Sequence, residues 1–309
     1  MNARPAEWTV DNAAWTGAQP RLSVLIPFMR DDPTALLAAL ARAPVDAEVV
    51  VLDDGTGDDL LAARVTAAVE ALPLPARFVR LSVNEGRSKG RNRLARNARA
   101  PHRLFLDSDM LPDGEGFLTA WLDLIAAEDP AVAFGGFSLD QTPRRPEHAL
   151  HRAMALKSDC LPAAERRKAP EKHVFTSNLL VRRDVFEAIG FDEAFAGWGW
   201  EDVEWAMRVA RAHPITHVDI PASHLGLDTA PAMAAKYEQS AANFARVVAG
   251  HREVVAAYPS YRAARLLKRL PLRGLWRPAV KAAALSPAPL PVRDFAMRLY
   301  RAALYAEAV

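Results

Sequence analysis

The chain has 309 residues, of which 50% are hydrophobic and 25% are charged, so it is long enough for one large α/β domain with an appendage. No run of 18 apolar residues occurs, and the N-terminus lacks the basic start and apolar core of a signal peptide, which argues against a membrane span and against secretion. A single cysteine, Cys160, excludes an internal disulfide framework, so we expect a cytoplasmic protein in which this thiol is a bystander.

Charge is unevenly distributed along the chain. Residues 252–309 carry 11 Lys and Arg against 3 Asp and Glu, a net charge of +8, whereas residues 1–251 carry 28 against 34, a net charge of −6. A basic tail on an acidic body indicates that the tail meets an anionic partner.

Short apolar runs alternate with helical segments in the first third of the chain. Strands are predicted at 22–27, 48–52, 76–82 and 103–107, and helices at 33–42, 60–71 and 86–100. This alternation predicts a mostly parallel sheet covered on both faces by helices. Acidic loops follow the second and fourth of these strands, at the edge where open α/β sheets bind ligands.

The second half is less regular. Strands are predicted at 131–138, 175–181 and 215–220, and helices at 147–159, 201–212 and 232–257, with a charged loop without periodicity at 160–173. We expect that loop to be mobile and to order as a lid over a bound donor. Three parts are therefore predicted: an N-terminal arm (1–20), a catalytic domain (21–257) and a basic helical C-terminal extension (258–309).

Two carboxylates follow the strand at 103–107. Asp107 and Asp109 are two residues apart and can both turn toward one divalent cation that holds a diphosphate. The same spacing also occurs in solvated turns, so the pattern alone is a weak signal.

Two other segments carry candidate donor-binding residues. Asp53 and Asp54 follow the strand at 48–52, where a carboxylate can accept hydrogen bonds from a nucleobase or a ribose. The basic helix that starts near Arg87 and contains Arg91 suits phosphate. The alternatives are an ordinary Asp–Gly turn and a solvated amphipathic helix.

The run Gly197-Trp198-Gly199-Trp200-Glu201-Asp202 is the most informative motif. Tryptophan stacks on the apolar face of a sugar ring, and either acid can take a proton from an attacking hydroxyl. The attraction of acids to a helix N-terminus explains Glu201 and Asp202 but leaves the two tryptophans unexplained. His224 can complete a metal site, with His217 as its competitor.

Taken in order, these segments resemble inverting glycosyltransferases of family 2, which have the GT-A type of fold. The matching segments are LSVLIP, VVVLDDGTGDD, NEGRSKGRN, LFLDSD, FTSNLLVRRDVFEAIGFDEAF, GWGWED and the later His224, over about residues 21–245. GWGWED is similar to the W-G-G-E-D acceptor loop of galactosyltransferases and chondroitin polymerases, with Trp200 in place of the second glycine.

The resemblance implies a role for each matching residue. Donor contacts would come from Pro27, Asp53, Asp54, Arg91, Asp107 and Asp109; metal ligation from Asp109 and His224; the catalytic base would be Asp202; and acceptor contacts would come from Trp198, Trp200 and Glu201. The cation would be Mn²⁺ or Mg²⁺. The implied reaction is a single displacement that moves a sugar from a nucleotide sugar, of which UDP is the expected nucleotide, to a hydroxyl of a glycan or lipid-linked acceptor.

Two other functions compete with this interpretation. LFLDSDML resembles the first motif of haloacid-dehalogenase phosphatases, and a catalytically inactive sugar-binding relative is the other alternative. Neither accounts for GWGWED together with Asp109 and His224. No nucleic-acid partner is expected.

The C-terminal extension combines basic and apolar side chains at helical spacing, interrupted by prolines. A basic amphipathic helix with a tryptophan suits the interface of an anionic membrane, so we expect a peripheral association at the cytoplasmic face. The competing interpretation is that the leucines pack on the catalytic domain and the arginines are solvated. The residues concerned are Arg262, Arg265, Lys268, Arg269, Arg273, Arg277 and Lys281 with Leu266, Leu267, Leu270, Leu275 and Trp276.

Overall fold

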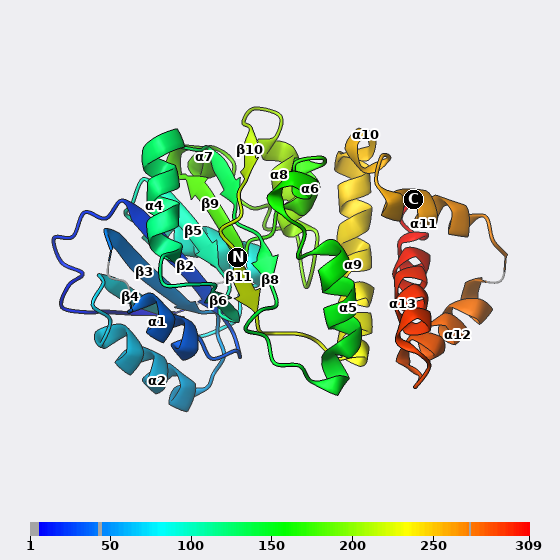
Figure 1. The fold of residues 1–309 in the computed structure, drawn as a ribbon, viewed down its shortest axis with the longest axis horizontal. Coiled ribbons are helices and arrows are strands. Elements are labelled where there is room, and N and C mark those ends of the chain that lie inside the picture. The colour runs from blue at the N-terminus through cyan, green and yellow to red at the C-terminus, as the bar shows by residue number, and fades with distance from the viewer. Residues whose placement is uncertain (1–5, 43–44, 272) are drawn as a thin grey trace.

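A large mixed sheet forms the centre of the protein (Figure 1), as described by a computed structural model of residues 6–42, 45–271 and 273–309. Its strand order is β1-β4-β3-β2-β5-β9-β7-β10, and all strands except β1 and β9 run in one direction. The predicted mostly parallel sheet is thereby confirmed. The strands are β1 (Glu7–Asp11), β2 (Leu22–Phe28), β3 (Ala47–Asp53), β4 (Ala76–Leu81), β5 (His102–Leu106), β7 (Val132–Phe134), β9 (Asn178–Arg182) and β10 (Ile215–His217).

Helices cover both faces of this sheet, because its central strands are apolar on both sides. β3 is buried along its whole length, as is β5. One face packs against α1 (Thr34–Leu40), α2 (Asp59–Glu70) and α4 (Phe117–Glu128). The other packs against α3 (Arg87–Asn97), α7 (Arg183–Ala188) and α8 (Glu201–Val209).

A second, three-stranded sheet was not predicted. It consists of β6 (Met110–Pro112), β11 (Ala222–His224) and β8 (Phe137–Ser138), with β11 in the middle. The predicted strand at 131–138 is thus two strands that belong to different sheets. In the β6–β11 pair, His224 lies opposite Met110, the residue that follows Asp109. The pairing therefore brings His224 close to Asp109.

The segment assigned to an N-terminal arm is partly integrated into the sheet. β1 pairs antiparallel with β4, and Trp15 is buried with the Arg99 guanidinium 3.6 Å from its ring centroid. Apolar and cation–π contacts therefore tie residues 7–15 to the catalytic domain, and the arm is not a separate unit over that stretch.

A helical block stands beside the sheet, on the right in Figure 1. Its apolar core joins α5 and α9 to the C-terminal helices, which pack on the catalytic domain through α13. The predicted helix at 232–257 is two helices that meet at His251. The block contains η1 (Pro146–His148), α5 (Ala149–Ser158), α9 (Ala230–Gly250), α10 (Arg252–Val255), α11 (Pro259–Lys268), α12 (Arg273–Leu285) and α13 (Leu290–Tyr305). Two short helices, α6 (Ala163–Arg166) and η2 (Pro170–His173), lie against β10 instead.

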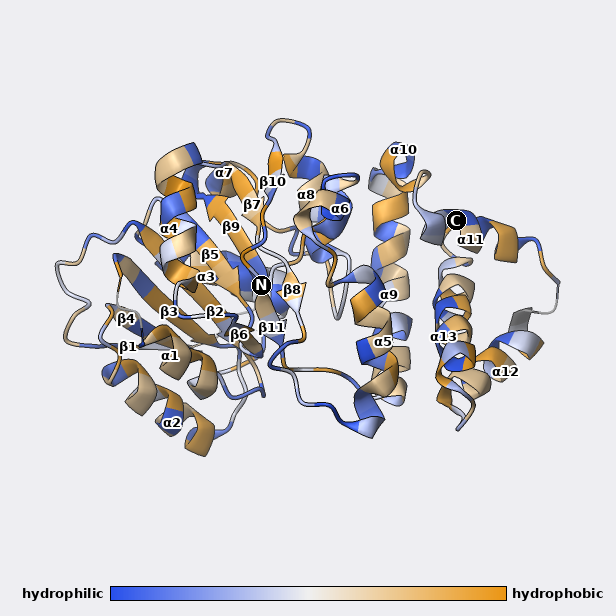
Figure 2. Ribbon diagram, viewed as in Figure 1, coloured by the Kyte–Doolittle hydropathy of each residue, from blue (hydrophilic) through white to orange (hydrophobic). Residues whose placement is uncertain are grey.

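The C-terminal helices carry apolar residues among hydrophilic ones (Figure 2), and these apolar residues divide between packing and exposure. Leu267 is buried at 8% exposure, whereas Leu266 and Leu275 are 65% and 72% exposed. Two of the basic residues, Arg277 and Lys281, pair with Glu307 and Glu238. The side chain of Arg273 lies outside the described residues. Among the helices that the structure describes, none has both the length and the apolar character needed to cross a bilayer.

Candidate functional site

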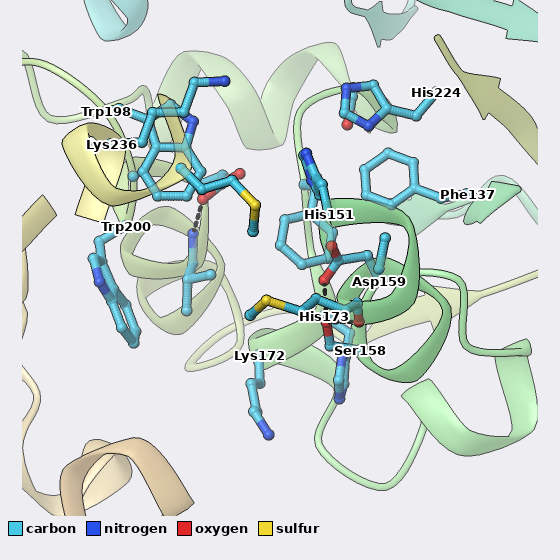
Figure 3. A pocket seen from close by; sticks show the side chains of 18 of the residues that line it. Phe137, His151, Ser158, Asp159, Lys172, His173, Trp198, Trp200, His224 and Lys236 are labelled. Atoms are coloured by element: carbon cyan, nitrogen blue, oxygen red, sulfur yellow. Dashed lines mark hydrogen bonds between the residues drawn. The ribbon is translucent and has the colours of Figure 1, made fainter. Parts of the chain in front are cut away.

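A cavity of about 670 Å³ adjoins the carboxyl end of β5, between the sheet and the helical block. Asp107, Asp109, Glu201, Asp202 and His224 all line it, so the fold brings together side chains that are far apart in the sequence. Figure 3 shows Trp198, Trp200 and His224 around the same space. The loop after β5, the GWGWED segment and the short strand β11 carry these groups, and together they form one site.

Asp109 and His224 form a pair at one end of the cavity. Asp109 Oδ2 lies 3.2 Å from His224 Nε2, and each side chain is about a quarter exposed, at 26% and 27%. Burial opposes both charges, but their mutual attraction outweighs it, so the pKa of Asp109 is lowered and that of His224 is raised. A Cβ at Gly226 would lie 2.0 Å from Asp109 Oδ2, so only glycine leaves room for this carboxylate.

These two side chains fit a divalent cation. In an octahedral site with bonds of about 2.1 Å, neighbouring ligand atoms lie about 3 Å apart, which matches the separation of this oxygen and nitrogen. Mixed oxygen and nitrogen ligands suit Mn²⁺ or Mg²⁺. Within the described part of the chain, no three His, Cys, Asp or Glu side chains gather closely enough to hold a metal, so a cation here would need further ligands from a substrate or water.

Glu201 and Asp202 start α8, where their charges favour the helix N-terminus. Burial opposes the ionisation of Glu201, but the charges of Arg87 and Arg91 prevail, so its pKa is lowered; its Oε1 accepts a hydrogen bond from Arg87 Nε. Burial and the adjacent Glu201 raise the pKa of Asp202 to about 7. Asp202 accepts a hydrogen bond from the Val203 N–H at 2.9 Å and forms no salt bridge with any described residue. The two acids therefore differ: Glu201 is a fixed anion, and Asp202 can exchange a proton near neutral pH.

The two tryptophans of the motif have different surroundings. Trp198 lines the cavity with Lys236 Nζ 5.9 Å from its ring centroid, and in Figure 3 these two side chains lie next to each other. Trp200 also lines the cavity, but its Nε1 donates to Tyr305 Oη at 2.9 Å and its ring lies 4.9 Å from that of Phe244. Trp200 is thus held by α9 and α13, and its expected contact with the acceptor stays a prediction.

The backbone at Trp200 has an unusual conformation for a residue with a side chain. Its φ of 74° lies in the left-handed region, which glycine adopts easily and other residues adopt at a cost. The contacts of Trp200 with Phe244 and Tyr305 offset that conformational cost, and they attach this segment to the C-terminal helix.

Asp107 is oriented by two arginines of α3. Its Oδ1 accepts a hydrogen bond from Arg91 Nη2 at 2.6 Å, and Arg87 Nη2 lies 3.9 Å from its Oδ2. Arg91 is only 2% exposed and does not line the cavity, so its burial argues against the direct donor contact that we expected. Arg87 lines the cavity instead, between Asp107 and Glu201.

Asp53 and Asp54 are directed inward and stabilise loops. Asp53, which is fully buried, accepts a hydrogen bond from the Thr56 N–H at 2.8 Å and lies 3.3 Å from Arg80. Asp54 accepts hydrogen bonds from Asn84, Glu85 and Gly86. Their side chains are engaged by the protein, so only their neighbourhood is open to a donor. Pro27 is partly exposed near the carboxyl end of β2.

His217 and Cys160 have structural surroundings. His217 is fully buried, accepts a hydrogen bond from Arg166 Nε and lies 3.0 Å from the Pro170 carbonyl oxygen, so it is not the competitor of His224. Cys160 lines the cavity, but burial and the charge of Asp159 raise its pKa to about 12. A thiol with such a pKa is unreactive at neutral pH.

The segment 160–173 is not irregular. It contains α6 and η2, and Arg166, only 2% exposed, donates hydrogen bonds to the Leu161 and Val218 carbonyls. Arg167 donates to the His217 carbonyl at 2.7 Å. These contacts fix the segment as a wall of the cavity and oppose the mobility that its charges suggested.

Several residues in or beside the cavity were missed by sequence reasoning. Asp31 follows β2, and burial together with the charge of Asp109 raises its pKa; its place after a strand end was an available signal. Asp228 lies 2.7 Å from Lys236 and 3.7 Å from His151, on elements of the helical block. These residues had no signal, because packing of distant helices brings them to the site.

Residues 23–190, more than half of the chain, match the domain described as Glycosyl transferase family 2. The chain belongs to glycosyl transferase family 2. The GT-A type α/β fold and the resemblance to this family are thereby confirmed. The phosphatase and the inactive relative are not favoured.

Two curated family relatives are glucosyltransferases. The chain is 32% identical over 229 residues to the validoxylamine A glucosyltransferase of Streptomyces hygroscopicus subsp. limoneus, which covers 65% of this chain and 50% of that protein. The corresponding protein of subsp. jinggangensis (strain 5008) is 31% identical over 229 residues, with 65% and 53% covered. The chain therefore spans about half the length of these relatives.

Solved structures with the same fold cover nearly the whole chain. The mannosyltransferase PcManGT from Pyrobaculum calidifontis, in complex with GDP-Man and Mn²⁺, has a TM-score of 0.60 at 18% identity and covers 95% of this chain and 88% of its own. S. aureus TarS 1-349 has a TM-score of 0.54 at 16% identity, with 93% and 90% covered, and its complex with UDP has a TM-score of 0.51. At these identities the likeness concerns the fold.

Proposed function

We propose that this family 2 enzyme is an inverting, metal-dependent glycosyltransferase that moves a sugar from a nucleotide sugar, with UDP as the expected nucleotide, to a hydroxyl of a glycan or lipid-linked acceptor. The observation that carries the proposal is the arrangement of the cavity. A metal-ligand pair, Asp109 and His224, and an acid with no ion-pair partner among the described residues, Asp202, line the same space.

The chain's own groups suit a single displacement. Asp109 and His224 would hold Mn²⁺ or Mg²⁺, which supplies stabilisation of the charge on the departing diphosphate. Asp107, held by Arg91, would face the ribose, and Pro27 with the loops around Asp53 and Asp54 would border the base. GDP-Man and Mn²⁺ in PcManGT, and UDP in TarS, support this class of donor.

The GWGWED motif would bind the acceptor and supply the base that deprotonates it. Asp202 would take the proton of the attacking hydroxyl, while Glu201 and its partner Arg87 keep the neighbouring charge fixed. Trp198 would form the wall against which the sugar rings lie. Attack from the face opposite the leaving group inverts the anomeric configuration without a covalent intermediate.

Slow hydrolysis of a nucleotide sugar tests this proposal. We expect release of free sugar from one member of a panel of UDP, GDP and dTDP sugars in the presence of Mn²⁺, and loss of that release with EDTA. Phosphate release from generic phosphomonoesters, with no activity on any nucleotide sugar, would contradict it.

We also propose that the C-terminal helices touch an anionic membrane surface. Arg262 and Arg265 of α11, and Arg269 directly after it, are exposed near the exposed Leu266 and Leu270. Basic residues at an anionic surface contribute about 1 kcal/mol each. Leu267 and part of Trp276 pack inward, so only part of the tail's apolar surface is available to lipid.

Vesicle flotation measures this association. The protein should float with vesicles rich in anionic lipid at low salt, and Leu266→Ser combined with Leu270→Ser should reduce the bound fraction. Leu60→Ser is the matched control, because Leu60 is 77% exposed on α2. Protein that stays at the bottom of the gradient with anionic vesicles would leave these helices a packing role alone.

A further inference from the structure

The cavity continues away from the metal-ligand pair toward the C-terminal helices. Lys172 of η2 and Arg298 and Arg301 of α13 line its far part. In Figure 3, Lys172 lies well away from His224 across the pocket. A second cavity of about 190 Å³ also has Arg298 and Arg301 among its lining residues. We call the part bordered by Lys172, Arg298 and Arg301 the basic chamber.

The two ends of the cavity have opposite charge. Asp107, Asp109 and Asp202 line the end near β5, whereas the basic chamber carries three cations from two separate segments. Asp159 also lines the cavity; burial raises its pKa, and the nearby charges of Arg301 and Arg298 oppose that rise. Without a bound cation, the carboxylates at the first end disfavour an anion, whereas the basic chamber attracts one.

The cations of the basic chamber are incompletely paired. Among the described residues neither Lys172 nor Arg301 forms a salt bridge; each instead faces an aromatic ring, Lys172 at 5.6 Å from the centroid of Tyr258 and Arg301 at 5.2 Å from that of Tyr237. Glu171, the nearest acid in sequence to Lys172, accepts a hydrogen bond from Tyr258 Oη at 2.9 Å.

Arg298 is paired at one nitrogen only. Its Nε donates to Asp294 at 2.6 Å, and its Nη2 is buried without a partner. Asp294 also binds Lys157 at 2.6 Å, so its charge is shared between two cations. Burial and the like charge of Arg301 lower the pKa of Lys172. Among the described residues, the cations of the basic chamber are thus only partly neutralised, and one of their N–H groups has no hydrogen-bond acceptor.

Removing cations from water without partners is unfavourable, and arginine and lysine together bind oxyanions through charge-assisted hydrogen bonds. We propose that the acceptor carries an anionic oxygen group, a phosphate ester or a carboxylate, which binds Lys172, Arg298 and Arg301 while its hydroxyl reaches Asp202. This assignment rests on the proposed transfer reaction and adds to it the chemical class of the acceptor.

Binding without donor or metal tests the basic chamber independently of turnover. Calorimetry in EDTA should detect inorganic phosphate binding to the full-length protein, and glucose 6-phosphate or glucuronate should bind at least about tenfold more tightly than glucose. Preference for glucose 6-phosphate assigns a phosphate ester, and preference for glucuronate assigns a carboxylate. Nucleotide-sugar hydrolysis is measured separately, so its absence would count against the transferase proposal alone.

Variants locate the bound anion. Lys172→Gln combined with Arg301→Gln should abolish the preference for the charged sugar, and Lys172→Arg combined with Arg301→Lys should restore it if the double glutamine variant is destabilised. The matched control is Arg262→Gln with Arg265→Gln, two exposed positions on α11. Equal affinity of the wild type for glucose and both charged sugars would overturn the proposal. A folded double glutamine variant that still prefers the charged sugar would also overturn it. So would a double glutamine variant that loses affinity for UDP but keeps its preference for the charged sugar.

Discussion

Asp202→Asn is expected to lower the rate of sugar transfer by a factor of about 10²–10⁴ while donor binding is retained, because a positioned general base contributes that much and an amide cannot accept the proton. The wild-type turnover should rise as the pH increases through about 7 and level off above it, since the base acts only when ionised and the pKa of Asp202 is raised to about 7. Turnover against pH, together with donor affinity by calorimetry, measures both effects.

Two further variants make this result specific. Asp123→Asn removes an exposed carboxylate on α4 and should leave transfer unchanged. Glu201→Gln weakens the partner of Arg87 and should impair both binding and transfer, because it disturbs an ion pair that borders the cavity. If Glu201→Gln proves inactive with normal donor binding and Asp202→Asn stays active, the assignment of the two acids is reversed.

Asp109→Ala is expected to abolish the Mn²⁺-dependent part of donor binding. Loss of residues that merely orient a metal ligand costs about 10–100-fold, so loss of the ligand itself should weaken UDP binding by at least about 100-fold. Calorimetric titration of UDP with Mn²⁺ and with EDTA measures this difference, and circular dichroism checks the fold.

The pairing with His224 provides a second variant for the same site. His224→Ala should also reduce the Mn²⁺ dependence, because its Nε2 lies 3.2 Å from Asp109 Oδ2. Asp123→Asn again serves as the control. An Asp109→Ala protein that binds UDP with the wild-type Mn²⁺ dependence would remove Asp109 from the metal site.

The part of the fold that sequence reasoning predicts is the part whose pattern is local. β2 and β3 are buried on both faces and therefore appear in the sequence as continuous apolar runs with clear ends. The carboxylates Asp107 and Asp109 follow such a run, so their place at the sheet edge was predictable. The short strands β6, β8 and β11 carry no such pattern, because their position depends on pairing across the chain.

In the candidate site, too, the sequence predicts the residues with a local pattern and not those placed by packing. Residues next to a strand end or within GWGWED were found, whereas their hydrogen-bond partners were not. Arg91 was expected to face the donor, but its burial and its bond to Asp107 depend on how α3 packs. Arg298 and Arg301 read as solvated cations on a helix, and only the docking of α13 turns them toward the cavity.

The bond between Trp200 and Tyr305 has a consequence for how the enzyme matures during synthesis. A ribosome produces the sheet and the acids at 201–202 well before α13, and domains begin to fold as they emerge. Until α13 docks, Asp202 faces a groove that lacks one wall, and the left-handed backbone at Trp200 lacks the contacts that offset its cost. We therefore expect the carboxylates at the sheet edge to be in place first, and the cavity proposed for the acceptor to be completed only when the last helix docks.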